Sequence, residues 1–209
     1  MTLLKDKVIQ LEEKYFYYQL FCHYYRGDLL YLTSIQWKKL LQTMREYPFL
    51  MKIDEVNQAL QMIKTADENE IAMYQYDYNR LFVGPNQLLA SPFESSYRNY
   101  EKNVLQRETL MVRNFYHHVG LQVADEGQIP DDHMQFELEL ILYLLSNEND
   151  QENLYEVFLT KHLFHWGFDH CQRILENSQN PITYAMGVLL REFLQQERMS
   201  MEGGNIDAN

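Results

Sequence analysis

The chain has 209 residues and a formal net charge of −12, and a negative field of this size disfavours nucleic acid as a partner. Only 8 glycines and 5 prolines are present, too few for an all-β protein with many tight turns, while 16 tyrosines and 11 phenylalanines argue against a disordered chain. No apolar run approaches the roughly 20 residues of a membrane span, so we expect no stable membrane insertion.

The first half of the chain shows helical periodicity. Shorter helices are predicted over 34–46, from Asp54 through Ile63, and over 67–82, where apolar residues share one face. Before them, seven residues spaced 4, 3, 4, 3, 4 and 3 apart predict a long first helix that ends at Gly27: Leu4, Val8, Leu11, Tyr15, Tyr18, Cys22 and Tyr25.

The connection that follows, 81–97, is unusually apolar and stiff. Gly84 and Pro85 end the preceding helix, since glycine suits the position after the last turn and proline cannot continue it. Ordinary connections between helices are short and polar. We interpret this segment either as a lid over the core or as one wall of a binding groove.

The second half again predicts helices. One covers 99–119, the next begins at Asp132, and another covers 151–165. A last helix begins at Asn180, whose side chain suits the N-cap before Pro181, and reaches about Glu197.

These patterns predict the fold class. Neither a strand with period 2 nor a repeat of 20–50 residues is visible. We therefore expect an all-α, single-domain helical bundle over 1–199, with 200–209 as a disordered tail. The two cysteines, Cys22 and Cys171, lack paired spacing, and no secretory signal is visible, so we expect a cytoplasmic location.

Three histidines near the end of the chain suggest a metal site. His162 and His165 are three residues apart, a spacing that places both on one helix face, and His170 follows. A helical metal-binding protein that uses these three residues is therefore one alternative. The other interpretation is that the intervening aromatic residues pack in the core and the histidines cover a helix end.

Two carboxylates and an imidazole precede another helix. Asp132 and Gln135 fit a capping box, which explains one carboxylate structurally. Helix capping explains neither Asp131 nor His133. Glu137 follows His133 by four residues and therefore lies on the same face of the helix. This patch suits recognition of an arginine-bearing segment, because carboxylates accept the guanidinium fork.

Two of these segments resemble a known family. Tyr78-x-x-Leu81-Phe82-x-Gly84-Pro85, followed by Pro92-Phe93-Glu94-Ser95-x-Tyr97, is similar to the central signature of the TorD/DmsD chaperones. Pro130-x-Asp132-His133-x-x-x-Glu137-Leu138 resembles their Asp-His signature, and His162-Leu163-x-x-Trp166-x-x-x-His170 a later segment. The motifs occur in the family's order, which makes the resemblance specific, and NarJ-like proteins are more distant relatives.

The resemblance implies a non-enzymatic chaperone with an all-α fold and no cofactor. Such proteins bind the twin-arginine signal peptide or the apo form of a molybdopterin-dependent oxidoreductase and hold it for cofactor insertion before export. The chain is expected to be a monomer or a homodimer. A regulatory module for another basic helix is a further alternative. The residues that the resemblance implies in client binding are Tyr78, Leu81, Phe82, Pro85, Pro92, Phe93, Glu94, Tyr97, Asp132 and His133.

Overall fold

The structure is a computed structural model that describes residues 9–98, 105–124, 126–146 and 153–204. These residues form helices joined by turns and loops, and they contain no β-strand beyond two isolated bridges, which confirms the all-α prediction. The elements are α1 Leu11–Arg26, η2 Asp28–Tyr31, α2 Ser34–Met44, η3 Leu50–Lys52, α3 Asp54–Thr65, α4 Glu68–Phe82, α5 Ser95–Arg98, α6 Arg107–His118, α7 Met134–Ser146, α8 Leu154–Phe158, η4 Leu159–Leu163, α9 Phe164–Asn177 and α10 Pro181–Gly204.

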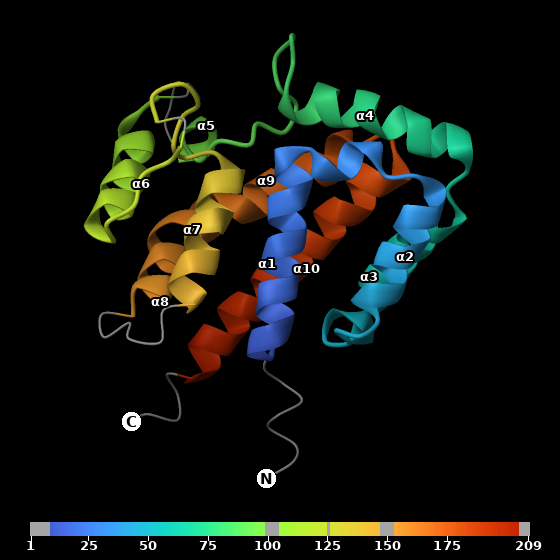
Figure 1. Ribbon diagram of the computed structural model, residues 1–209, viewed down its shortest axis with the longest axis horizontal. Helices are drawn as coiled ribbons and strands as arrows, with labels where there is room; N and C mark the ends of the chain where they lie inside the picture. Colours follow the sequence, from blue (N-terminus) through green and yellow to red (C-terminus); the bar gives the residue numbers. More distant parts are fainter. Residues whose placement is uncertain (1–8, 99–104, 125, 147–152, 205–209) are drawn as a thin grey trace.

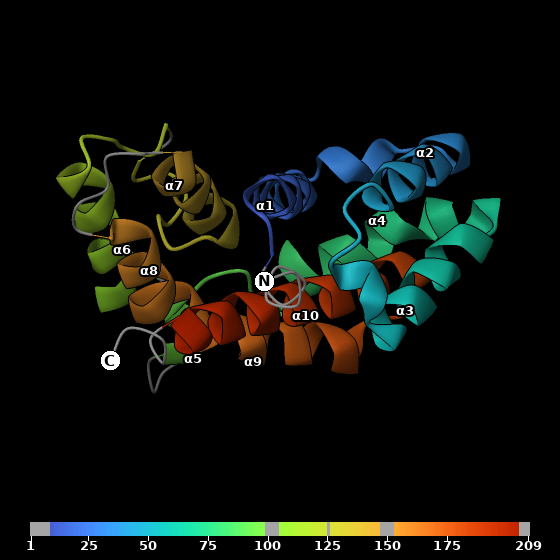
Figure 2. The ribbon, with the colours of Figure 1, turned by 90° about the horizontal axis from the view of Figure 1, so that it is seen from below.

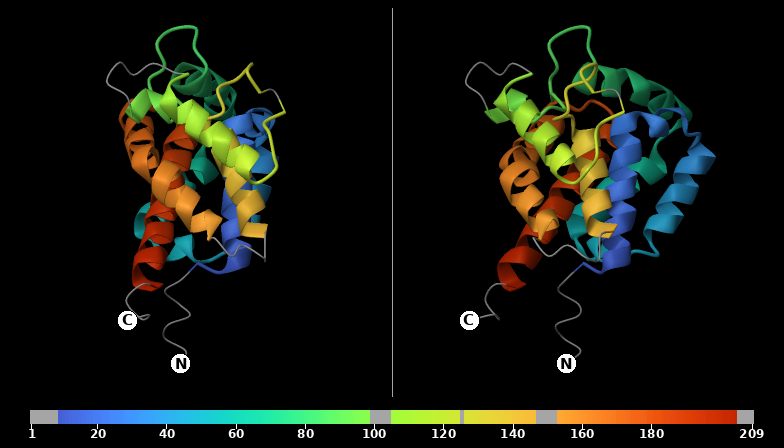
Figure 3. Two further views of the ribbon diagram at one scale, coloured as in Figure 1. Left: turned by 90° about the vertical axis from the view of Figure 1, so that its left-hand side faces the viewer. Right: turned by 60° about the vertical axis from the view of Figure 1, so that its left-hand side comes forward.

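The helices pack around α1 and α10 (Figure 1). α1 packs against α7, and α10 packs against both α9 and α3. Seen from below, α6, α7 and α8 gather on one side and α2, α3 and α4 on the other (Figure 2). The start of α1 and the end of α10 lie at the same end of the molecule (Figure 3). No described helix has the length and apolar character of a bilayer span.

Aromatic side chains join α1 to α10. The ring of Phe193 lies 5.5 Å from that of Tyr17, 4.8 Å from Tyr18 and 5.7 Å from Phe21, and all four are buried. Leu11, by contrast, is exposed. The predicted stripe is therefore wrong in including Leu11 and misses Tyr17 and Phe21, because α1 packs against both α7 and α10.

Several predicted helix bounds need correction. The helix predicted over 151–165 is α8, which passes through the π-helical turn η4 into α9. α7 begins at Met134 instead of Asp132. α10 continues to Gly204, past the predicted end at Glu197, so the first part of the predicted tail is helical. Residues 1–8, 99–104, 125, 147–152 and 205–209 lie outside the described residues, and with them the predicted contributions of Leu4 and Val8.

α9 and α10 approach each other through two glycines. A Cβ atom on Gly187 would lie 2.7 Å from Cγ2 of Ile174, and one on Gly167 would lie 2.9 Å from Cδ1 of Leu194. Both distances are shorter than a carbon–carbon contact allows. Glycine is needed most strictly at Gly187, because Cγ2 of Ile174 belongs to a stiff β-branched side chain, whereas the end of the Leu194 side chain can shift away from Gly167.

We expect Gly187→Ala to destabilise the protein. Alanine adds about 1 kcal/mol of helix propensity, but overpacking against a β-branched residue costs about 1–3 kcal/mol. Urea unfolding should therefore show a net loss, whereas Gln195→Ala, on the exposed face of the same helix, should change the unfolding free energy by less than about 0.5 kcal/mol. A gain in stability for Gly187→Ala would mean that α9 and α10 can move apart to accept the methyl group, and it would contradict the need for glycine at this position.

Candidate functional site

The loop that follows α4 is hydrogen-bonded to the last turn of that helix at two points, Gly84 and Ala90. The amide of Gly84 donates to the carbonyl of Asn79 (2.9 Å), and its φ of +101° explains why glycine occupies this position. The amide of Ala90 then donates to the carbonyl of Leu81 (3.1 Å). Between these two bonds the loop carries the exposed Pro85 and rises beside the end of α4 (Figure 1).

The two motifs of the sequence are joined by backbone pairing. The amide of Glu94 donates to the carbonyl of Asp132 (3.0 Å), and the amide of Met134 donates to the carbonyl of Pro92 (2.8 Å). Phe93 and His133 face each other in this pairing as an isolated antiparallel bridge. Segments almost forty residues apart thus form one unit.

Asp132 holds this unit together with its side chain. The carboxylate is fully buried; Oδ2 accepts the backbone amide of Ser95 (2.8 Å) and Oδ1 accepts the hydroxyl of Thr109 from α6 (2.7 Å). The predicted capping box is therefore wrong, because both oxygens are used outside α7. His133 takes that position instead, and its Nδ1 accepts the amide of Gln135 (3.1 Å).

His133 is uncharged in this environment. Its ring packs edge-on against Phe93, with centroids 4.9 Å apart, and more loosely against Phe136. Burial lowers its pKa from 6.5 to about 4. At neutral pH the imidazole is therefore neutral, with Nδ1 as an acceptor.

Other carboxylates are buried around the pairing. Glu94 and Asp131 are both fully buried and charge-compensated: Arg98 and His162 bond to Glu94, the latter at 2.8 Å, and Arg113 binds both oxygens of Asp131 at 2.8 Å. Such paired, hydrogen-bonded carboxylates are tolerated in a protein interior. They fix α5 and α6 to the loops on either side.

Glu137 differs from Glu94 and Asp131 because no cation among the described residues is paired with it. It accepts the indole N–H of Trp166 (3.2 Å), and its other oxygen has no partner there. Burial, and then the negative charge of Glu94, raise the pKa of Glu137 well above its ordinary value. We infer that Glu137 carries a proton at neutral pH.

An aromatic network supports the other side of the loop. The hydroxyl of Tyr97 donates to the carbonyl of Ser91 (2.8 Å) and lies 3.0 Å from Nδ1 of His170, whose Nε2 lies 2.6 Å from the hydroxyl of Tyr25. Tyr78 donates to the carbonyl of Tyr25 (2.9 Å). Burial lowers the pKa of His170 to about 3, so this network is neutral as well.

The predicted client-binding residues divide by exposure. Pro85 is exposed, and Phe93, Tyr97 and His133 are partly exposed. The other six are buried: Tyr78, Leu81, Phe82, Pro92, Glu94 and Asp132. Their contact with a client stays a prediction, and the buried ones would act by holding the surface in shape. Sequence reasoning missed Thr109 and Arg113, because no local pattern links α6 to Asp131 and Asp132.

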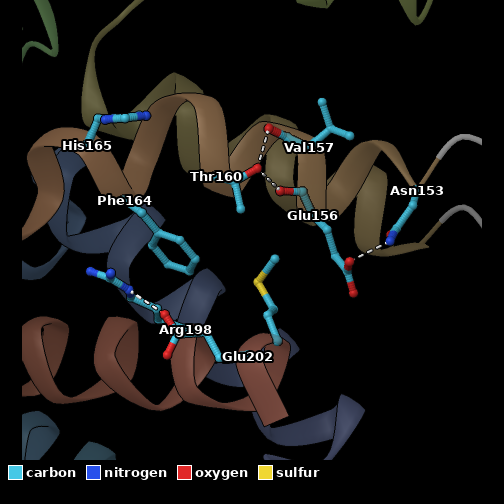
Figure 4. A pocket seen from close by; sticks show the side chains of 9 residues that line it. Asn153, Glu156, Val157, Thr160, Phe164, His165, Arg198 and Glu202 are labelled. Atoms are coloured by element: carbon cyan, nitrogen blue, oxygen red, sulfur yellow. Dashed lines mark hydrogen bonds and ion pairs between the residues drawn. The ribbon is translucent and has the colours of Figure 1, made fainter. Parts of the chain in front are cut away.

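The three histidines of the metal alternative have different surroundings and do not form one site. His162 is paired with Glu94, and both ring nitrogens of His170 are bonded to tyrosines. His165 is exposed and lines a separate cavity of about 490 Å³ between α8–α9 and α10 (Figure 4). No group of three or more possible metal ligands occurs in the described part of the chain. The arrangement does not favour the metal alternative.

Glu137→Gln tests the inferred proton. Because the pKa of Glu137 is raised on folding, the contribution of Glu137 to stability is greatest below about pH 4.5, where its carboxyl is protonated in the unfolded chain as well. This contribution falls as the pH rises toward the pKa of the folded state. Glutamine keeps an acceptor for Trp166 and cannot ionise. We expect its stability relative to the parent to rise by about 1 kcal/mol per pH unit between pH 5 and 7 in urea unfolding.

Glu137→Ala is the matched control for this variant. It removes the acceptor of Trp166 and leaves a cavity, so we expect a loss of about 2–4 kcal/mol at pH 5. A constant difference between Glu137→Gln and the parent across the pH range would contradict the inferred proton.

Comparison with known proteins gives consistent results. The sequence is 30% identical over 135 residues to the Tat proofreading chaperone DmsD of Salmonella typhimurium, which covers 65% of this chain and 64% of that protein. It is 26% identical over 138 residues to the probable Tat proofreading chaperone DmsD of Haemophilus influenzae, covering 66% and 64%. The matched part thus spans less than two thirds of these relatives.

Among solved structures, a putative redox enzyme maturation protein from Archaeoglobus fulgidus has a similar fold. The TM-score is 0.52 and the identity 20%, with 88% of this chain and 93% of that one covered. The profile of the family described as nitrate reductase delta subunit matches residues 49–172, which is more than half of the chain and includes every motif quoted above. The chain therefore belongs to the nitrate reductase delta subunit family, and its resemblance to the TorD/DmsD chaperones is confirmed.

Proposed function

We propose that the chain is a redox-enzyme maturation chaperone. It binds the twin-arginine signal peptide or the apo form of a molybdopterin-dependent oxidoreductase and holds this precursor until its cofactor is inserted. The observation that carries the proposal is the joining of the two family motifs into one bonded unit, in a chain whose relatives are named proofreading chaperones. Binding would take place in the cytoplasm, before export.

The chemistry of the site supports binding over catalysis. Glu94 and Asp132 are buried and fully engaged, and the two ring nitrogens of His170 are bonded to tyrosines. Cys22 and Cys171 are buried, and burial raises the pKa of each thiol, to about 12 for Cys22. Neither thiol is therefore a nucleophile at neutral pH. We propose a non-catalytic role in which these groups maintain a surface.

The accessible part of the motif unit suits a basic, partly apolar peptide. Phe93 and Pro85 supply apolar surface, and the imidazole of His133, being neutral, does not repel arginine. The net charge of −12 attracts a cationic segment and increases its rate of association at low salt.

Titration calorimetry with synthetic signal peptides tests the proposal. Peptides that carry the twin-arginine motif of a molybdopterin oxidoreductase precursor should bind the purified chain, and their affinity should fall as salt increases. A matched peptide with both arginines replaced by glutamine should bind at least tenfold more weakly. If neither these peptides nor the apo oxidoreductases bind, the proposal fails, and the alternative of a module for another basic helix becomes the better explanation.

Phe93→Ala tests the motif surface without disturbing the buried bonds. We expect peptide affinity to fall about tenfold, as for a partly exposed aromatic anchor, with unchanged helicity. Tyr143→Ala, which removes an exposed aromatic side chain from α7, is the control and should bind like the parent. Equal binding by Phe93→Ala and Tyr143→Ala would remove Phe93 from the client surface.

Asp132→Ala is expected to act through stability. It leaves the amide of Ser95 and the hydroxyl of Thr109 without their acceptor, which should cost about 1–3 kcal/mol in urea unfolding. Any loss of peptide binding in this variant should therefore recover at lower temperature or with excess peptide. Normal stability together with lost binding would indicate direct contact between Asp132 and the client.

A further inference from the structure

The outer face of α4 carries a second stripe that the core does not use. Asn69, Met73, Tyr76, Arg80 and Val83 are spaced 4, 3, 4 and 3 apart, so they share one face of the helix. The exposed fractions of Met73, Tyr76 and Val83 are 48%, 63% and 63%. α4 lies along the upper edge of the molecule in Figure 1.

Two hollows follow this stripe and meet at Tyr76. One, of about 270 Å³, lies between the first half of α4 and the turn that joins α9 to α10, and includes Met73 and Pro181. The other, of about 440 Å³, lies between the end of α4 and the loop 83–94 that joins α4 to α5, which we call the motif loop. It includes Pro85 and Leu89. Because Tyr76 lines both, the two hollows adjoin along α4, and together we call them the α4 groove.

The walls of the α4 groove are held in place by buried hydrogen bonds. Asp77 accepts the amides of Gln179 and Asn180 (3.0 Å each), and the side-chain amide of Asn180 donates to the carbonyl of Glu70 (2.6 Å). Arg80 bonds to Asp77 (2.6 Å) and also to a carbonyl at the end of α9. A groove held in this way costs little entropy to order around a ligand.

Charge is distributed unevenly along the α4 groove. In its middle, the charge of Arg80 is compensated by Asp77. At the start of α4, Asp67, Glu68 and Glu70 form no ion pair with any other described residue, and the exposed Glu68 accepts a hydrogen bond from the hydroxyl of Ser34. Of these three carboxylates Glu70 lines the first hollow, and Asp67 and Glu68 lie beside it at the start of α4. Negative charge is therefore concentrated near this end of the groove, while the motif loop residues that line the other end are uncharged.

We propose that the α4 groove binds the twin-arginine segment in one orientation. The basic n-region lies at the acidic start of α4, and the apolar region extends past Tyr76 to Leu89, so that the peptide runs parallel to α4. This rests on the proposed function and specifies its site. The 15 residues of α4 span about 22 Å, which matches about seven residues of extended peptide.

Disulfide trapping tests both the site and the direction. The native cysteines are buried, so a cysteine placed at an exposed position reacts selectively. Asn69→Cys should trap a peptide with a cysteine just before its arginine pair, and Gln87→Cys should trap one with a cysteine after its apolar region. Gln42→Cys, exposed on α2, is the control and should trap neither. The reverse pairing would overturn the orientation, and trapping no stronger than at Gln42→Cys would overturn the groove.

Affinity measurements separate this inference from the proposed function. Tyr76→Glu introduces a charge into the apolar part of the α4 groove and should weaken peptide binding at least tenfold. Glu68→Lys should weaken it severalfold and reduce its dependence on salt, whereas Glu12→Lys on exposed α1 surface should have a smaller effect. If parent, Tyr76→Glu and Glu68→Lys bind the peptide equally, the groove is wrong and the chaperone function stands. If the parent itself binds no precursor, the proposed function fails.

Discussion

The functional region depends on one buried carboxylate, that of Asp132. Its two oxygens accept donors from two different segments, the amide of Ser95 at the start of α5 and the hydroxyl of Thr109 in α6, while its backbone carbonyl accepts the amide of Glu94. A buried carboxylate is stable only when such donors surround it. Asp132 thereby fixes the position of Pro92–Glu94, and with it the half-exposed Phe93.

Around Asp132 the interior balances charge by two physical routes. Glu94 is paired with Arg98 and His162, and Asp131 is paired with Arg113. Glu137 and His133 instead lose their charge, since burial raises the pKa of one and lowers the pKa of the other. The result is a rigid, largely neutral unit within an acidic protein. A peptide can meet this unit without displacing a buried ion pair, which would be costly.

The sequence predicted most helices because their apolar spacing is a local property. α4 and its N-cap Asp67 follow directly from that spacing and from capping chemistry. The pairing of Phe93 with His133 could not be predicted, since backbone bonds between distant segments leave no local signal. Asp132 looked like a helix cap for the same reason: its true donors, Ser95 and Thr109, are 37 and 23 residues away.

The outer stripe of α4 illustrates a different limit. Its spacing is visible in the sequence, but the same helix also carries the core residues Tyr74 and Tyr78, and composition alone does not show which apolar side chains stay exposed. Only the packing of Asp77 against the α9–α10 turn makes this face a groove. The α4 groove thus depends on contacts that tie α4 both to the loop that follows it and to the α9–α10 turn.

Hydrogen–deuterium exchange on the free and peptide-bound chain tests this account most directly. We expect the amides of Glu94, Ser95 and Met134 to exchange slowly in both states, because they are hydrogen-bonded in the free protein. Added twin-arginine peptide should give new protection over 83–89, which forms the motif-loop wall of the α4 groove. Rapid exchange of those three amides in the free chain, or peptide binding that leaves 83–89 unchanged, would contradict it.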